Sequence, residues 1–165
     1  MREIDVQLKN NDLKHLYLLY GAEDYLKKFY KNRLIKATVA EGDTMNFSSV
    51  AGPCEDSTEI INLINTLPFF APLRVILVED SGLFNQSDEK LAACIGALPD
   101  TTMIIFVEEK VNLSCGTTKA AKKHGEVIKL DTPEPKDLER WGLTFIKRSD
   151  KRITRDAWNE FVQRT

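Results

Sequence analysis

The regular alternation of short apolar segments with amphipathic ones is the strongest constraint on the fold. Five segments have the composition of strands, most of them buried on both faces, and they are residues 15–21, 45–52, 74–80, 101–109 and 126–131. Helical patterns separate them, at residues 22–40, 56–67, 87–98 and 115–125. Neighbouring parallel strands need a crossover connection, which is commonly a helix. The sequence therefore predicts a three-layer α/β domain in which helices cover both faces of a mostly parallel, five-stranded sheet.

A change of pattern near residue 132 predicts a domain boundary. The segment DTPEPKD, at 131–137, contains two prolines and four charged residues, as linkers often do. Two helical patterns follow without a strand between them, at 135–150 and 153–165, and Thr154 is the expected N-cap of the second. We therefore expect residues 1–132 to form the α/β domain and residues 133–165 to begin a helical domain, in a fragment of a longer protein.

Composition and charge argue against several classes of protein. The 23 lysines and arginines are balanced by 25 aspartates and glutamates, so the chain lacks the positive excess that holds a nucleic-acid backbone. The basic segments 119–124 and 147–152 leave a nucleic-acid-binding module as a minor alternative.

No apolar run approaches the roughly 20 residues that span a bilayer, and the N-terminus lacks a secretory pattern, so we expect a cytoplasmic protein without membrane contact. Three cysteines without close spacing predict free thiols and no zinc site; they are Cys54, Cys94 and Cys115.

The first strand-to-helix turn is where such a domain would bind a nucleotide, and the sequence lacks the residues for it. A phosphate-binding loop needs GxxxxGK[ST], and a dinucleotide-binding turn needs GxGxxG. Here Gly21 leads into Glu23 and Asp24, whose carboxylates would repel an anion. Glu79 and Asp80 end an apolar strand as magnesium ligands of nucleotide hydrolases do, but without a phosphate loop the ion has nothing to bridge. We therefore predict no catalytic site, no metal ion and no cofactor on this chain.

Two adjacent phenylalanines on a proline-bounded connection are the most informative feature that remains. Phe69 and Phe70 lie between Pro68 and Pro72, which indicates a turn and not a helix or a central strand. In one interpretation both rings fold inward and complete the core. In the other, the turn presents Leu67, Phe69 and Phe70 outward as a rigid apolar plug for a pocket on a partner protein, because aromatic side chains often dominate small interfaces.

Several motifs, taken in order, resemble the delta subunit family of bacterial DNA polymerase III. They are LYLLYGAEDYL at 16–26, LPFFAPLRVILVED at 67–80 followed by SGLF, TTMIIFVEE at 101–109, and EVIKLDTPEPKDLERW at 126–141. The resemblance implies an AAA+-like domain that has lost its ATP site, followed by part of a helical domain. It also implies that the carboxy-terminal collar domain of the family is absent from this chain.

The resemblance further implies a role in DNA replication as a non-catalytic subunit of a DNA-directed DNA polymerase holoenzyme. In the family, a hydrophobic pair before the third strand enters a pocket of the sliding clamp and helps to open it. By position this pair is Phe69 and Phe70, with Leu67 as a further contributor. The expected partners are the clamp (beta subunit) and, through regions absent here, the other clamp loader subunits, with DNA contacted only in the assembled loader. Pro68 departs from the pattern, because it removes a backbone donor beside the pair.

The alternative is a degenerate nucleotide-binding or flavodoxin-like domain with a small-molecule site. Such a domain would bind its ligand at the carboxyl ends of the strands. It predicts that Phe69 and Phe70 face inward, whereas the plug interpretation predicts that they face outward. The orientation of the two rings therefore discriminates between these functions.

Overall fold

The computed structural model describes residues 3–131, 153–154, 157–158 and 160. The chain separates into two compact units, Met1–Leu130 and Asp131–Thr165. The helix predicted at 135–150 lies outside the described residues, as does most of the one predicted at 153–165. In the second unit, the amide of Ala157 donates a hydrogen bond to Oγ1 of Thr154 at 3.4 Å, as expected for an N-cap.

The first unit is built around a sheet of five strands, all of which pair in parallel. The strands are β1 (Leu16–Tyr20), β2 (Phe47–Ala51), β3 (Arg74–Glu79), β4 (Thr102–Glu108) and β5 (Glu126–Lys129). Their order across the sheet is β2-β3-β4-β1-β5. The register places Leu18 beside Phe106, and Ile76 beside Ile104. The predicted α/β class and the number of strands are therefore confirmed.

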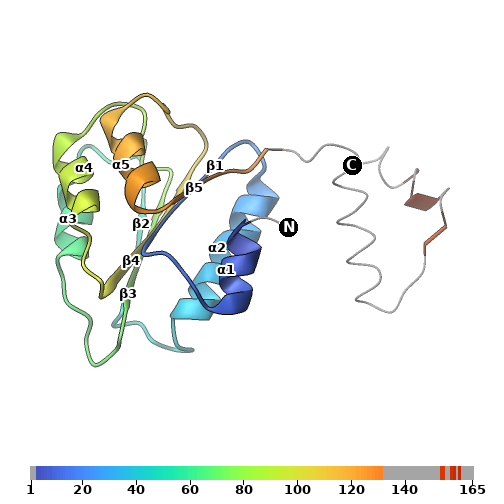
Figure 1. The fold of residues 1–165 in the computed structure, drawn as a ribbon, viewed down its shortest axis with the longest axis horizontal. Coiled ribbons are helices and arrows are strands. Elements are labelled where there is room, and N and C mark those ends of the chain that lie inside the picture. The colour runs from blue at the N-terminus through green and yellow to red at the C-terminus, as the bar shows by residue number, and fades with distance from the viewer. Residues whose placement is uncertain (1–2, 132–152, 155–156, 159, 161–165) are drawn as a thin grey trace. The chain divides into compact units, whose positions relative to one another are not determined.

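Five helices in the described part of the chain cover this sheet. They are α1 (Glu3–Asn10), α2 (Asp24–Thr38), α3 (Thr58–Ile64), α4 (Glu89–Gly96) and α5 (Gly116–His124). Helices α1 and α2 lie on one face of the sheet, and α3, α4 and α5 lie on the other (Figure 1). Four of the helices follow the sequence prediction, whereas α1 is additional. The arrangement is the predicted three-layer one.

The middle residues of the central strands are apolar on both sides because both faces of the sheet are covered. In β4, Ile104 and Phe106 pack in the core beneath α3, α4 and α5. The alternate residues Ile105 and Val107 pack in the core beneath α1 and α2. This alternation explains why the strands read as continuous hydrophobic runs. All strands run the same way. The segments that precede the strands therefore meet at one end of the sheet, here called the amino edge, and the segments that follow them meet at the other end, the carboxyl edge.

Candidate partner-binding site

Residues 67–72, between α3 and β3, form an irregular turn at the amino edge of the sheet. The large apolar side chains of this turn are exposed. The exposed fractions are 75% for Leu67, 56% for Phe69 and 97% for Phe70. The two rings contact each other edge to face, with centroids 4.6 Å apart and an interplanar angle of 82°. The interpretation in which both rings complete the core is therefore wrong. The inward orientation that the flavodoxin-like alternative predicts is wrong for the same reason.

The exposure of this turn is unusual within the described part of the molecule. Single exposed apolar residues are common on protein surfaces, whereas a cluster of them indicates an interaction site. Seven large apolar side chains are exposed among the described residues, and Phe70 and Leu67 are the two most exposed. Met45, which is 61% exposed, precedes Asn46, whose side chain accepts a hydrogen bond from the N–H of Phe69. Four of these seven side chains, those of Met45, Leu67, Phe69 and Phe70, thus lie in the turn or beside it.

The end of α3 determines where the turn begins. The hydroxyl of Thr66 donates to the carbonyl of Asn62 at 2.8 Å, and the hydroxyl of Thr102 donates to the carbonyl of Ile64 at 3.2 Å. These bonds satisfy carbonyl groups that the last helical turn leaves without partners. Pro68 cannot continue a helix, and it disfavours the helical conformation at Leu67. The chain therefore leaves the helix before the exposed residues.

Asn46, which directly precedes β2, holds the turn through its side-chain amide. The N–H of Phe69 donates to Oδ1 of Asn46 at 2.6 Å, and Nδ2 of Asn46 donates to the carbonyl of Phe69 at 3.0 Å. The carboxylate of Asp43 accepts a further hydrogen bond from the same Nδ2 at 2.8 Å. The sequence alone does not identify Asn46, because 23 residues separate it from Phe69 and its local pattern is that of any polar loop residue.

The backbone of Phe70 lies in the left-handed region, with a φ of +50°. For an L-residue other than glycine, this conformation costs about 1–2 kcal/mol. The ring gains little from the fold in return, because it is almost wholly exposed. Strained residues that persist are typical of functional sites, where the surrounding structure determines their conformation. Phe70 is thus strained and contributes little to the core of this domain.

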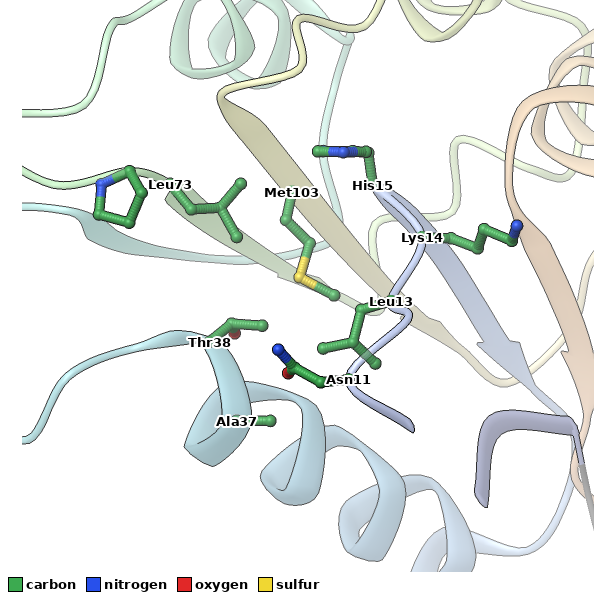
Figure 2. A pocket seen from close by; sticks show the side chains of 9 residues that line it. Asn11, Leu13, Lys14, His15, Ala37, Thr38, Leu73 and Met103 are labelled. Atoms are coloured by element: carbon green, nitrogen blue, oxygen red, sulfur yellow. The ribbon is translucent and has the colours of Figure 1, made fainter. Parts of the chain in front are cut away.

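An open hollow of about 330 Å³ lies beside the turn on the same edge of the sheet. Figure 2 shows its lining, which includes Leu13 from the α1–β1 loop, Met103 from β4 and Leu73, which follows the turn. His15, also at its rim, forms a hydrogen bond through Nδ1 with the carbonyl of Thr102 at 3.0 Å. The lining is mostly apolar and holds no cluster of catalytic groups. An apolar lining of this kind suits contact with a macromolecule.

At the carboxyl edge, the first strand-to-helix turn leads into α2, and two acidic residues of the chain itself interact with the first turn of that helix. The N–H of Gly21 donates to the carbonyl of Glu109 at 3.2 Å. Glu23 is the N-cap of α2 and accepts the N–H of Tyr25 at 3.3 Å, and Asp24 forms an ion pair with Lys27 at 2.9 Å. Carboxylates thus lie where a nucleotide-binding domain would place phosphate oxygens.

The hollow at this carboxyl edge, about 580 Å³ in volume, carries more negative than positive charge. Four carboxylates and two lysines contribute to its lining. One of the carboxylates belongs to Glu108, which is buried and accepts hydrogen bonds from the hydroxyl and N–H of Ser81 and from the N–H of Gly82. Burial raises the pKa of Glu108, although these hydrogen bonds offset part of the effect. The site is electrostatically unfavourable for a nucleotide phosphate.

The other candidate features of the sequence carry no assembled site in the described part of the chain. Cys54, Cys94 and Cys115 are free thiols, as predicted. No group of three potential metal ligands converges among the residues that the structure describes. The basic residues of 119–124 lie on α5, where the lysines are exposed, whereas 147–152 lies outside the described residues. Within the same described ranges, no helix has the length and the apolar composition needed to cross a bilayer.

Comparison with known proteins identifies the family. The model of the family described as DNA polymerase III, delta subunit, matches residues 17–131. The chain belongs to the DNA polymerase III delta subunit family. The delta subunit of DNA polymerase III from Bacillus subtilis is 25% identical over 168 residues, which include 94% of this chain and 48% of that protein. This member of the delta subunit family therefore spans about half the length of the curated relative that it matches.

Solved structures support the fold of this delta subunit family member. The Bacillus subtilis DNA clamp loader delta protein matches with a TM-score of 0.78 and 24% identity, over 97% of this chain and 51% of that one. A DNA polymerase III gamma subunit-related protein from Thermotoga maritima matches with a TM-score of 0.54 and 10% identity, over 84% of this chain and 48% of that one. At these identities the likeness concerns the fold alone.

Proposed function

We propose that this chain is the clamp-binding part of a clamp loader delta subunit. In this proposal it binds the sliding clamp through Leu67, Phe69 and Phe70 and opens it for loading onto DNA during replication. One observation carries the proposal. Within a member of this family, the turn that sequence resemblance assigns to clamp binding presents Phe69 and Phe70 to solvent, with exposed fractions of 56% and 97%. Apolar anchors of this kind supply much of the energy of small interfaces.

The mechanism is driven by binding and needs no catalysis on this chain. The plug shifts the clamp towards an open state only if its contacts with the open state are stronger than those with the closed state. A preorganised turn helps, because little conformational entropy is then lost on binding. The negative charge around Asp24 and Glu108 supports an AAA+-like domain without a working ATP site. In this account ATP acts through other subunits of the loader.

The remaining partners follow from the same proposal. The other clamp loader subunits are further partners, and DNA is contacted only in the assembled loader. The chain is then a non-catalytic subunit of a DNA-directed DNA polymerase holoenzyme, and it works in the cytoplasm, where bacterial replication takes place.

The test is calorimetric titration of the 165-residue chain with the sliding clamp of Bacillus subtilis, the organism of the curated relative. The double variant Phe69→Ala/Phe70→Ala is titrated in parallel, after circular dichroism has shown unchanged folding. We expect the wild-type chain to bind and the double variant to lose that binding. Absence of binding by the folded wild-type chain would refute the proposal.

A further inference from the structure

We propose that Asn46 is a positioning residue that holds the turn 67–72 in the conformation that binds the clamp. This inference rests on the proposed function, and it adds a residue that lies outside the apolar plug. Asn46 is 5% exposed and therefore acts on the partner only through the turn. The apolar residues supply the contact surface, and Asn46 determines how the backbone presents them.

The two hydrogen bonds between Asn46 and Phe69 satisfy both backbone polar groups of that residue. Oδ1 accepts the N–H of Phe69 at 2.6 Å, and Nδ2 donates to its carbonyl at 3.0 Å. Within the described part of the chain, no other side chain hydrogen-bonds to the backbone of residues 67–72. The two proline residues of this segment have no N–H groups of their own to donate. The amide of Asn46 is therefore the main polar restraint on the turn.

The neighbours of Asn46 fix the direction of its amide group. A carboxylate only accepts hydrogen bonds, so the amide nitrogen must face Asp43, which it meets at 2.8 Å. The oxygen then faces Phe69, whose N–H can only donate. Aspartate at position 46 would bring two carboxylates together and would lose the donor to the carbonyl of Phe69. The site thus requires an amide, and not just any polar side chain.

The backbone around Asn46 is itself anchored, so the restraint has a rigid support. The N–H of Asn46 donates to Oδ1 of Asp43 at 3.0 Å, and its carbonyl accepts the N–H of Val75 at 2.8 Å. Nη1 of the buried Arg74 donates to the carbonyl of Met45 at 3.2 Å. Asn46 therefore connects the turn to the start of β2 and β3, and through them to the sheet.

Loss of this restraint should weaken binding while the apolar side chains remain in place. Without Asn46, the backbone of Phe69 becomes free to sample other conformations, and the strained φ of Phe70 loses its nearest support. The clamp must then order the turn at the moment of binding. Since two hydrogen bonds of ordinary strength are removed, we expect the affinity of Asn46→Ala to fall by about 10-fold.

The experiment compares four variants of the 165-residue chain with the wild type, using the Bacillus subtilis sliding clamp as the probe. The variants are Asn46→Ala, Asn46→Asp, the exchange Asn46→Asp/Asp43→Asn, and Asn32→Ala as a control at an exposed asparagine of α2. Calorimetry gives the dissociation constant, urea unfolding gives the stability, and hydrogen exchange by NMR reports on the amide of Phe69. Affinity is measured where unfolding curves show each form to be fully folded.

The expected pattern separates positioning from a general loss of stability. Asn46→Ala should bind about 10-fold more weakly and should exchange the Phe69 amide faster, while Asn32→Ala matches the wild type. Asn46→Asp should bind more weakly still. The exchange variant should recover about threefold relative to Asn46→Asp. The reason is that the amide introduced at position 43 donates to the carboxylate introduced at position 46, which still accepts the N–H of Phe69.

Three outcomes would overturn the inference, and they can be told apart. If the wild type binds and folded Asn46→Ala binds equally well, Asn46 does not position the turn, although the proposed function stands. If the wild type itself does not bind, both the proposed function and this inference fail. If Asn46→Ala does not fold, the exchange variant decides, and its failure to improve on Asn46→Asp would contradict the role assigned to the amide.

Discussion

Alanine substitutions along the turn should weaken clamp binding in the order of the exposure of the side chains that they remove. Phe70 is 97% exposed, Leu67 75% and Phe69 56%. A side chain can gain from binding only through the surface that the free protein leaves in water. Phe70→Ala should therefore cost the most affinity and Phe69→Ala the least.

The magnitudes follow from these exposed fractions. Complete burial of a large apolar side chain stabilises by about 1.5–3 kcal/mol, so Phe70→Ala should weaken binding by about 10- to 150-fold. For Phe69, whose exposed fraction is 56%, the corresponding loss is about 4- to 15-fold. Folding should hardly change in Phe70→Ala, with an unfolding free energy within about 0.5 kcal/mol of the wild type. The losses of affinity in Phe69→Ala and Phe70→Ala will not add simply in the double variant, because the two rings contact each other.

The assay is calorimetric titration of each single variant with the clamp, together with urea unfolding of the free chain. Tyr25→Ala is the matched control, because Tyr25 is 56% exposed, as Phe69 is, but lies at the opposite edge of the sheet in α2. The control should bind as the wild type does. Unchanged affinity in Phe70→Ala, or an equal loss in Tyr25→Ala, would refute the reasoning.

Three further predictions concern the fold and the carboxyl edge. Gly125→Ala should lower the unfolding free energy in urea by about 1–3 kcal/mol, because the added Cβ would lie 2.5 Å from the carbonyl oxygen of Leu16; wild-type stability would rule out this close approach. Burial raises the pKa of Glu108 in the folded state, so the stability of the wild type relative to Glu108→Gln should fall as the pH rises from about 4 through that raised pKa. Parallel stability–pH curves of the two proteins would contradict this. Millimolar ATP with magnesium should leave the melting temperature unchanged, and stabilisation that increases with ATP concentration would show that the acids near Asp24 do not exclude a nucleotide.

Local sequence patterns predict the elements of this fold but not their arrangement. The central strands are recognisable because burial on both faces gives them continuous apolar runs, as in Val75 to Val78. Their order depends on pairing between distant segments, such as Leu18 with Phe106, which no local pattern encodes. Helix α1 is missing from the prediction because it has only eight residues, so that only one apolar pair at helical spacing, Ile4 and Leu8, packs on the core.

The periodicity of α2 is also misleading about its lysines. By helical spacing, Lys27 and Lys31 fall on the side opposite the apolar residues. In the structure Lys27 is buried and paired with Asp24 at 2.9 Å, and Lys31 is paired with Glu79 at 2.6 Å. Long side chains can bury their apolar stems and still reach a carboxylate, so residue type alone does not give their environment.

The candidate site was predictable in part. The prolines indicate a turn at Phe69 and Phe70, but an apolar residue on a turn can face either the core or solvent, and only the packing around it decides. Here α3 and β3 already fill the core with Ile60, Ile64 and Ile76, which leaves the two rings outside. Asn46 was beyond prediction, because its role depends on a contact across 23 residues and not on its neighbours in sequence.

The most direct measurement of the central claim is release of the sliding clamp from nicked circular DNA. Labelled clamp is first loaded onto the DNA, the 165-residue chain is added in excess, and gel filtration separates free clamp from clamp that remains on the circles. The account predicts that the wild-type chain releases the clamp and that Phe69→Ala/Phe70→Ala does not. Clamp that stays on the DNA at saturating wild-type chain would contradict the claim that this turn opens the clamp.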